Sequence, residues 1–260
     1  MTTTSIEWTQ ATWNPVTGCT RASAGCDHCY AVAKSHRLGS IAKTRAKYGG
    51  LTVLNDRGDR HFNGTVRTHE DALSLPLRRK KPTIWFVNSM SDLFHRDVPF
   101  DFIDRVFMVM ALCSHHTFQV LTKRPHRMAE YLTSRVGEFD RILPVMDAIA
   151  EIAPGVALSE DMGSWITDGR WSLRNVWYGT SIEDQAAANF RIPYLLNCPL
   201  PPGGIRFVSC EPLLGPVDLS GWFTRPEWGE PNEQGLRPLE MHDDLIHWLI
   251  LGVESRGGRA

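Results

Sequence analysis

Short apolar runs recur along the chain, and each one ends abruptly in polar residues. The runs are rich in β-branched and aromatic residues, and most of them are apolar along their length rather than at alternate positions. This pattern is typical of strands that are buried on both faces of a parallel sheet. Six segments are expected to form such strands: ATWNPVTGC (11–19), TIWFVNSMSD (83–92), TFQVLTKRP (117–125), NVWYGTSIED (175–184), IRFVSCEPLLG (205–215) and IHWLILGVES (246–255).

Helical patterns separate several of these strands. Residues 100–114 carry apolar side chains at helical spacing after the start signal Pro99, and residues 125–136 open with a proline. A third helix is expected over 184–197, broken at Pro193. Strands that alternate with helices predict an α/β fold with a parallel sheet.

The length of the chain favours one large domain. A single α/β barrel commonly has about this many residues, so residues 1–260 are expected to form one barrel-type unit. Three stretches interrupt the strand and helix pattern without a sustained hydrophobic period of their own. These stretches are expected to be loop or helical elaborations of the barrel, at about 38–76, 136–172 and 220–244.

Polar residues follow five consecutive strands at the point where each strand ends. A single Ser, Thr or Asp in such a place is often only a helix cap. In parallel α/β folds, however, ligands bind at the carboxyl edge of the sheet, so the whole set predicts a polar cavity of mixed charge there. The set comprises Asn88, Ser89, Ser91, Asp92, Thr122, Lys123, Arg124, Thr180, Ser181, Glu183, Ser209, Cys210, Glu211, Glu254 and Ser255.

Three of the six cysteines fall within eleven positions directly after the first predicted strand, in GCTRASAGCDHCYA. A structural zinc site usually has four protein ligands. Cys19, Cys26 and Cys29 supply three, and His28 would have to reach the same ion across one peptide unit from Cys29. Three thiolates alone suit a 4Fe-4S cluster that leaves one iron open to a small molecule.

Composition and charge limit the other functions. The formal net charge is -1 and 42% of residues are hydrophobic, so the whole-molecule charge gives no reason for attraction to nucleic acid or membranes. The N-terminus has no basic stretch followed by an apolar run, and no segment is apolar enough to span a membrane. We therefore expect a cytoplasmic protein with reduced thiols. The isolated Cys113, Cys198 and Cys210 are expected to be buried structural thiols.

Basic residues gather in two places despite the balanced total charge. The run LRRKKP (77–82) is short, and a solvated turn is the simpler interpretation of it. A second group follows the third predicted strand, where it could contact phosphate and admits a nucleic-acid or nucleotide substrate. This group comprises Lys123, Arg124, His126 and Arg127.

Six motifs, in order, resemble a family of phage-associated proteins of unassigned activity. That family in turn resembles radical SAM enzymes, with spore photoproduct lyase among the closer relatives in the cysteine region. The resemblance spans nearly the whole chain and implies a partial (β/α)6 TIM-type barrel with parallel strands and outer helices. The motifs are WNPVTGCTRASAGCDHCYA, FVNSMSDLFH, LTKRP, GTSIED, SCEPLLG and GVES.

The resemblance also implies two cofactors and their contacts. Cys19, Cys26 and Cys29 would hold a 4Fe-4S cluster, S-adenosylmethionine would chelate its open iron, and an electron-donor protein would supply the electron that cleaves the sulfonium to a 5′-deoxyadenosyl radical. Contacts to S-adenosylmethionine or to the substrate would come from polar groups at the strand ends and beside the last cysteine. The residues implied or proposed for these contacts are His28, Ser89, Ser91, Asp92, Lys123, Ser181, Glu183 and Glu211.

Two departures from the radical SAM pattern keep other functions open. Six residues separate Cys19 from Cys26 where radical SAM enzymes usually have three, and NSMSD (88–92) stands in place of their Gly-Gly-Glu signature. One alternative is a non-catalytic barrel that binds zinc or a structural cluster. The other is an interaction protein with idle thiols, acting beside a partner encoded in the gene neighbourhood. Family members are expected to continue past GVESRGGRA with a further C-terminal segment.

Overall fold

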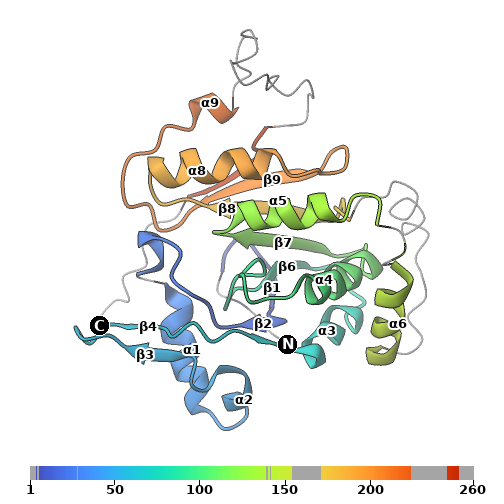
Figure 1. The fold of residues 1–260 in the computed structure, drawn as a ribbon, viewed down its shortest axis with the longest axis horizontal. Helices are drawn as coiled ribbons and strands as arrows, with labels where there is room; N and C mark the ends of the chain where they lie inside the picture. Colours follow the sequence, from blue (N-terminus) through green and yellow to red (C-terminus); the bar gives the residue numbers. More distant parts are fainter. Residues whose placement is uncertain are drawn as a thin grey trace.

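Six parallel strands form the central sheet of the described chain (Figure 1). The computed structural model describes residues 4, 6–27, 29–138, 140, 142–153, 171–223 and 245–251. The spatial order of the strands is their order along the chain, and every neighbouring pair is parallel, which confirms the predicted α/β class. The strands are β1 (Ala11–Trp13), β6 (Ile84–Val87), β7 (Thr117–Thr122), β8 (Val176–Ser181), β9 (Ile205–Cys210) and β10 (Trp248–Leu251).

The sheet curls around the side chain of Trp8. The Trp8 ring lies 4.6 Å from the ring of Phe86 in β6 and 6.5 Å from that of Phe207 in β9, centroid to centroid. It also lies 6.3 Å from Trp248 in β10. In a flat sheet, β6 and β9 would be separated by three strand spacings, about 14 Å. One indole ring can therefore reach all three strands only because the sheet bends around it.

Helices α4 (Phe100–Leu112), α5 (Pro125–Ser134) and α8 (Gln185–Leu196) lie on one face of the sheet in Figure 1, close to their predicted ranges. The predicted break at Pro193 is wrong, because α8 continues through it. A proline inside a helix removes one backbone hydrogen bond. Nearby, Asn197 N still donates to Pro193 O at 3.0 Å, and Ile192 and Leu195 are buried, so tertiary packing outweighs the local preference.

The segment between β1 and β6 carries several elements that the sequence did not predict. It contains the cysteine loop, residues 18–29, together with two small antiparallel ribbons and three helices, and one strand of the first ribbon precedes the loop. The elements are β2 (Val16–Thr17), η1 (Ala24–Cys26), α1 (Tyr30–Ser40), α2 (Arg45–Tyr48), β3 (Thr52–Leu54), β4 (Arg60–Phe62), β5 (Arg67–Thr68) and α3 (Glu70–Leu77). Two further helices, α6 (Ile142–Ile152) and α9 (Ser220–Phe223), follow α5 and β9.

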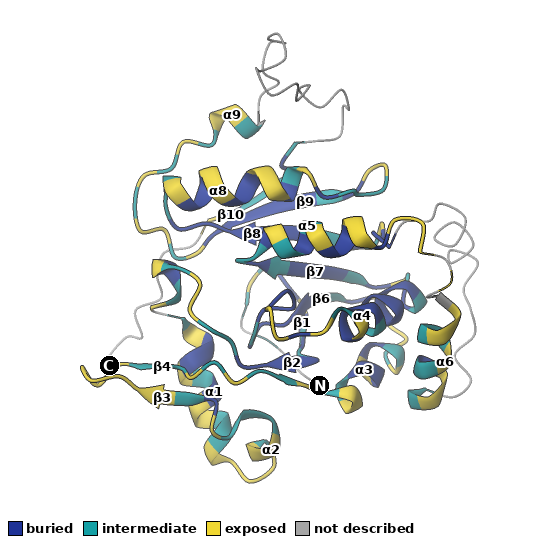
Figure 2. Cartoon of the chain, viewed as in Figure 1, coloured by how far each residue is buried: buried dark blue, intermediate teal, exposed yellow. Residues whose placement is uncertain are grey.

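The core lies between the sheet and its covering helices. Figure 2 shows buried strands at the centre and exposed outer faces on α5 and α8. Helix α4 is buried on most of its surface, with Phe107 and Val109 fully inaccessible, because it packs between the sheet, α3 and α6.

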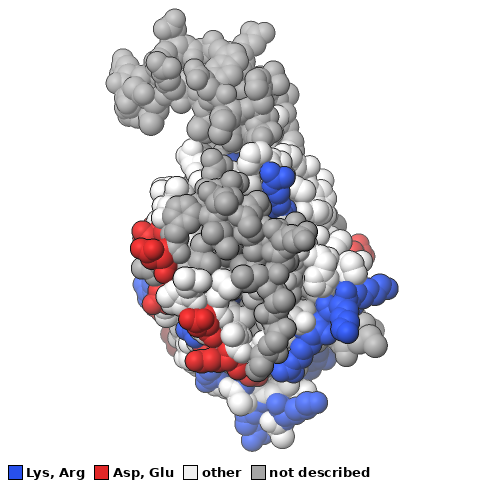
Figure 3. Space-filling view, turned by 90° about the vertical axis from the view of Figure 1, so that its right-hand side faces the viewer, with Lys and Arg blue, Asp and Glu red and all other residues white. Residues whose placement is uncertain are grey.

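On the face shown in Figure 3, Lys and Arg gather at the lower right and Asp and Glu at the lower left. Within the described residues, no helix is long and apolar enough to cross a membrane.

Candidate functional site

The cysteine loop is attached to the end of β6 before its first thiol. Gly18 forms a parallel bridge with Ser91, and Ser91 Oγ donates to Val16 O at 2.9 Å. Gly18 has a φ of +84°, and a Cβ at this position would lie 2.0 Å from Thr65 O. Only glycine fits this backbone conformation and this close approach. The position of Cys19 is therefore fixed relative to the carboxyl edge of the sheet.

The NSMSD segment (88–92) joins both ends of the cysteine loop. Asn88, with a φ of +59°, accepts a hydrogen bond from Val16 N at 3.1 Å through Oδ1. Asn14 Oδ1 accepts from Ser89 Oγ at 3.2 Å, and Tyr30 OH donates to Ser89 O at 2.8 Å. Tyr30 directly follows Cys29, so the segment that replaces the glycine signature contacts the chain on either side of the three cysteines.

The other two thiols sit in a tight turn at the start of α1. Cys26 ends η1, Cys29 is the N-cap residue of α1, and Cys29 N donates to Cys26 O at 3.2 Å. Ala22 N lies 3.5 Å from Cys26 Sγ as a hydrogen-bond donor. All three thiols of the loop are partly buried and unpaired by disulfides. His28 lies outside the described residues.

Burial and neighbouring charges shift the thiol pKa values. Burial raises the pKa of Cys19 to about 12, and Asp92 adds to this rise while Arg124 opposes it. The charges of Cys26 and Cys29 also raise the pKa of Cys19, so the three sulfurs interact electrostatically. Burial likewise raises the pKa of Cys29. In the metal-free protein these two thiols are protonated at neutral pH, and metal binding would release their protons.

Asp92 is the centre of a buried hydrogen-bond network. Its Oδ1 accepts from Thr122 Oγ1 at 2.7 Å and from Phe94 N at 3.0 Å. Its Oδ2 accepts from Arg124 Nη1 at 2.9 Å and from Lys123 N at 3.2 Å. The carboxylate thereby joins the ends of β6 and β7. Both oxygens of Asp92 already accept two hydrogen bonds from the protein. A contact from Asp92 to S-adenosylmethionine would therefore have to use an oxygen that is already engaged.

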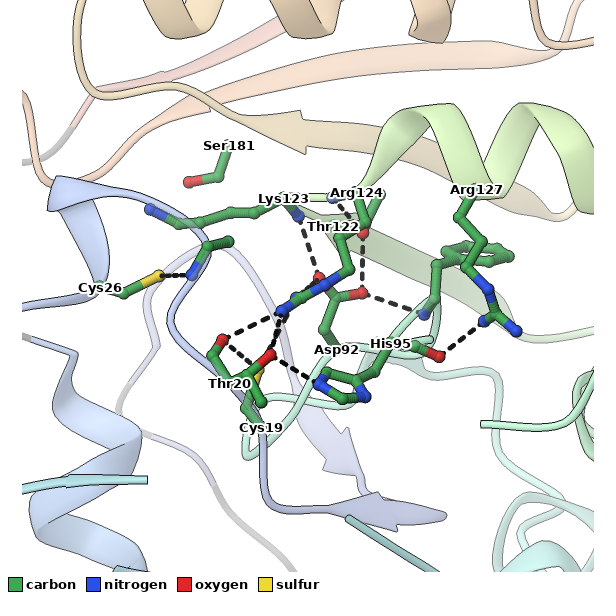
Figure 4. Close-up of polar contacts among 12 residues, drawn as sticks. Cys19, Thr20, Cys26, Asp92, His95, Thr122, Lys123, Arg124, Arg127 and Ser181 are labelled. Carbon is green, nitrogen blue, oxygen red and sulfur yellow. Dashed lines mark hydrogen bonds and ion pairs between the residues drawn. The ribbon is translucent and has the colours of Figure 1, made fainter. Parts of the chain in front are cut away.

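Arg124 connects Asp92 with the cysteine loop (Figure 4). Its Nη2 donates to Thr20 O at 3.0 Å and to Thr20 Oγ1 at 2.9 Å, and its Nη1 lies 3.8 Å from Cys19 Sγ. Thr20 Oγ1 is also 2.7 Å from His95 Nε2. The sequence placed Arg124 at the edge but gave no sign of its contact with a thiol. The basic group held beside Cys19 would stabilise a thiolate there.

A second charged group surrounds Glu183. Lys123 Nζ lies 3.2 Å from Glu183 Oε2, and Arg191 donates to both carboxylate oxygens at 2.8 and 3.2 Å. Burial opposes ionisation of Glu183, but the hydrogen bonds from Arg191 and the charge of Lys123 hold its pKa below the usual value. A Cβ on Gly25 would lie 2.6 Å from Lys123 Nζ, so the cysteine loop packs directly on this group. Arg191, inside the predicted helix, was missed.

The remaining predicted residues lie at the ends of β8 and β9. Ser181 Oγ donates to Glu211 O at 3.5 Å, and Ser209 Oγ donates to Glu211 Oε2 at 3.5 Å. Glu211 is exposed, whereas Ser181 and Ser209 are buried. The structure thus brings the predicted strand-end residues that it describes to one edge of the sheet, beside the cysteine loop. Glu254 and Ser255 lie outside the described residues.

The thiols of Cys19, Cys26 and Cys29 are chemically suited to hold a 4Fe-4S cluster. Within the described part of the chain, no three His, Cys, Asp or Glu side chains are placed to hold one metal ion. Three thiolates of a cubane cluster bind three different irons, so their sulfurs need not converge on one point. The other cysteines have no such arrangement: Cys113, Cys198 and Cys210 are buried singly, as predicted, and burial raises the pKa of each.

Comparison with known proteins shows the family to which the chain belongs. No curated protein matches the chain significantly. Among solved structures, a cysteine-to-serine mutant of spore photoproduct lyase is similar at 12% sequence identity and a TM-score of 0.42. The similar region covers 82% of this chain and 48% of that one, so this chain spans about half the length of the lyase structure. Residues 3–260 match the family described as "Protein of unknown function (DUF5131)", and the chain belongs to that family.

Proposed function

We propose that this protein is a radical SAM-type enzyme with a partial (β/α)6 barrel. In this proposal, Cys19, Cys26 and Cys29 hold a 4Fe-4S cluster whose fourth iron binds S-adenosylmethionine. The observation that carries the proposal is the position of the cysteine loop. Three thiols lie at the carboxyl edge of a curled, six-stranded parallel sheet, beside a group of buried charges. The carboxyl edge is where barrels of this class bind ligands.

The chemistry of the proposal requires one electron from outside the protein. A reduced cluster held by Cys19, Cys26 and Cys29 would pass on that electron, and its transfer to S-adenosylmethionine would cleave one sulfur–carbon bond to give methionine and a 5′-deoxyadenosyl radical. We therefore retain an electron-donor protein as a partner. No acid or base is needed for this step, and none is assigned.

The residues of this chain position the cofactors. Arg124 compensates negative charge at Cys19, since it already faces that sulfur. Ser89 and Ser91 hold the end of β6 against Asn14 and Val16, which lead into the cysteine loop, through their hydrogen bonds. Glu211 is an exposed carboxylate at this edge, and beside its hydrogen bond from Ser209 it has acceptor positions left for the amino group of the cofactor. Lys123 and Glu183 are a paired group within reach of the loop.

The decisive test is the metal content of anaerobically purified protein. We expect about four irons and four acid-labile sulfides per chain, with absorption near 400 nm. Cys26→Ala should lose most of the iron because one of only three ligands is removed, whereas Cys113→Ala should keep it, since Cys113 is buried apart from the loop. With dithionite and S-adenosylmethionine, the wild-type protein should release 5′-deoxyadenosine.

Three results would argue against the proposal. Stoichiometric zinc, or no iron after anaerobic reconstitution, would favour a structural or interaction role for the barrel. Equal iron in Cys26→Ala and in the wild-type protein would remove the loop from the metal site. A stable cluster without release of 5′-deoxyadenosine would leave an iron–sulfur protein that does not cleave S-adenosylmethionine.

A further inference from the structure

A basic cavity of about 500 Å³ opens beside the cysteine loop. Its wall combines residues 20–22 of the loop, the start of α5 and the middle of α8. Among the described residues, its lining contains His126 and no carboxylate. The six Lys and Arg residues that line it are Arg21, Arg96, Lys123, Arg124, Arg127 and Arg191.

The carboxylates that pair with these cations lie outside the lining and are too few to neutralise it. Asp92 pairs with Arg124, and Glu183 serves both Lys123 and Arg191. Arg21 and Arg96 are exposed and pair with one surface aspartate each, Asp27 and Asp97. Five of the six cations thus share four carboxylates. The cavity therefore has an excess of positive charge, which favours an anionic ligand.

Arg127 is the cation without a carboxylate partner among the described residues. Its Nη1 donates to His95 O at 2.6 Å and its Nη2 donates to Val98 O at 2.8 Å. Its guanidinium also lies over the ring of Phe100, 4.6 Å from the centroid. These contacts hold the charge in place without neutralising it. A fixed guanidinium of this kind is suited to phosphate oxygens.

Exposed aromatic rings stand at the rim of the same cavity. Phe190 lines the cavity and is 54% exposed, and Tyr194, one turn further along α8, is 39% exposed. The rings of His126, Phe190 and Tyr194 are mutual neighbours, with centroids 5.5 to 6.2 Å apart. Exposed rings beside a basic groove are the usual surface on which unpaired bases stack.

We propose that this cavity binds an unpaired nucleotide unit. Its phosphate lies among the guanidinium groups and its base stacks on Phe190 and Tyr194. The binding of this ligand is argued from the cavity itself. Its role as the substrate of the neighbouring cofactor site rests on the proposed function. The cavity volume is within the range of sites that hold one small-molecule ligand. Stacking requires a base that is not paired in a duplex, so a single strand or a free nucleotide is favoured.

Fluorescence anisotropy with the full-length chain tests this assignment. The probe is a fluorescein-labelled single-stranded oligonucleotide, displaced in turn by unlabelled duplex, by ADP and by pyrophosphate. Arg21→Glu/Arg96→Glu should weaken binding of the single strand by about tenfold or more and lower its salt dependence. Phe190→Ala should weaken the single strand and ADP by about tenfold but leave pyrophosphate unchanged, because only stacking is lost.

Two exposed positions elsewhere provide matched controls. Arg57→Glu reverses a charge in the turn between β3 and β4, and Leu143→Ala removes an exposed apolar side chain from α6. Both should bind as the wild-type protein does. Tighter binding of the single strand than of ADP would support a nucleic-acid strand, and similar binding of both would support a free nucleotide, each within the proposal.

Several results would overturn the proposal. These are the absence of saturable binding of both the oligonucleotide and ADP, equal losses in the control variants, and insensitivity of the single strand and ADP to Phe190→Ala. The last result would reduce the cavity to a simple anion site. The titrations use both the anaerobically reconstituted protein and the protein freed of iron with a chelator, and release of 5′-deoxyadenosine is measured on the reconstituted protein. Saturable nucleotide binding by a reconstituted protein that forms no 5′-deoxyadenosine would contradict the proposed function alone. Formation of 5′-deoxyadenosine without saturable nucleotide binding would contradict the nucleotide assignment alone.

Discussion

The guanidinium of Arg124 lies 3.8 Å from the sulfur of Cys19 while it forms a 2.9 Å ion pair with Asp92. Arg124 follows β7 and Cys19 precedes the 3-10 turn of the cysteine loop, so this contact joins the loop to the carboxyl edge of the sheet. Both members of the ion pair are largely buried. Removal of one member would therefore leave the other charge buried without a partner.

Arg124→Gln is expected to lower the free energy of unfolding by about 3 kcal/mol, because Asp92 loses its countercharge. Asp92→Asn should lower the free energy of unfolding by a similar amount. The loss in the double variant should be smaller than the sum of the two single losses by at least about 1 kcal/mol. Urea unfolding of the four proteins measures this coupling. Arg96→Gln is the control, since its exposed ion pair should contribute about 0.5 kcal/mol or less. Strict additivity would show that the pair does not act as a unit.

Gly179→Ala is expected to lower the free energy of unfolding, because the added methyl group would collide with a side chain inside the curled sheet. A Cβ on Gly179 would lie only 2.4 Å from the ring of Phe207, its register partner in β9. Overpacking of this kind costs about 1–3 kcal/mol. Phe207→Leu should reduce that cost in the double variant, as measured by urea unfolding. Gly221→Ala, where no atom lies within 4 Å of the new Cβ, should change stability by no more than about 0.5 kcal/mol. An equal loss in both glycine variants would contradict the packing argument.

His116 is expected to make the fold sensitive to acid. Burial lowers its pKa to about 4, and its ring Nε2 lies 3.2 Å from Pro76 O. The unfolded chain binds the proton more tightly, with a pKa of about 6.5. The contribution of neutral His116 to the free energy of unfolding is therefore fully present above about pH 6.5. It falls by about 3 kcal/mol as the pH is lowered to 4.

Urea unfolding between pH 4 and pH 7.5 measures this dependence. His116→Gln keeps a side-chain N–H donor for Pro76 O but has no titrating ring, so its free energy of unfolding should change less with pH across this range. His61→Gln, at an exposed position, should follow the wild-type profile. Parallel profiles for His116→Gln and the wild-type protein would assign the acid sensitivity to other groups.

Most of the sheet could be predicted from the sequence because its signals are local. Each apolar run became a strand within its predicted range, and the polar residues after it lie where parallel strands place them. The helix over 184–197 shows the limit of this reasoning. Pro193 signals a break by its own geometry, but the burial of Ile192 and Leu195 keeps the helix continuous. The short elements between β1 and β6 carry weak periodic signals and were therefore missed.

The sequence by itself determined the parallel α/β class, the carboxyl-edge position of the three cysteines and the singly buried state of the other three. These properties follow from residue type and spacing along the chain. Only the tertiary structure decided that Arg124 faces Cys19, that Arg191 pairs with Glu183, and that Phe190 stands beside a basic cavity. The contact of Arg124 with Cys19 and the cavity beside Phe190 join different strand–helix units, so they depend on how far the sheet curls and on which helix faces meet. The Arg191–Glu183 pair forms within one unit and depends on how the chain passes from β8 into α8. No local pattern encodes these features.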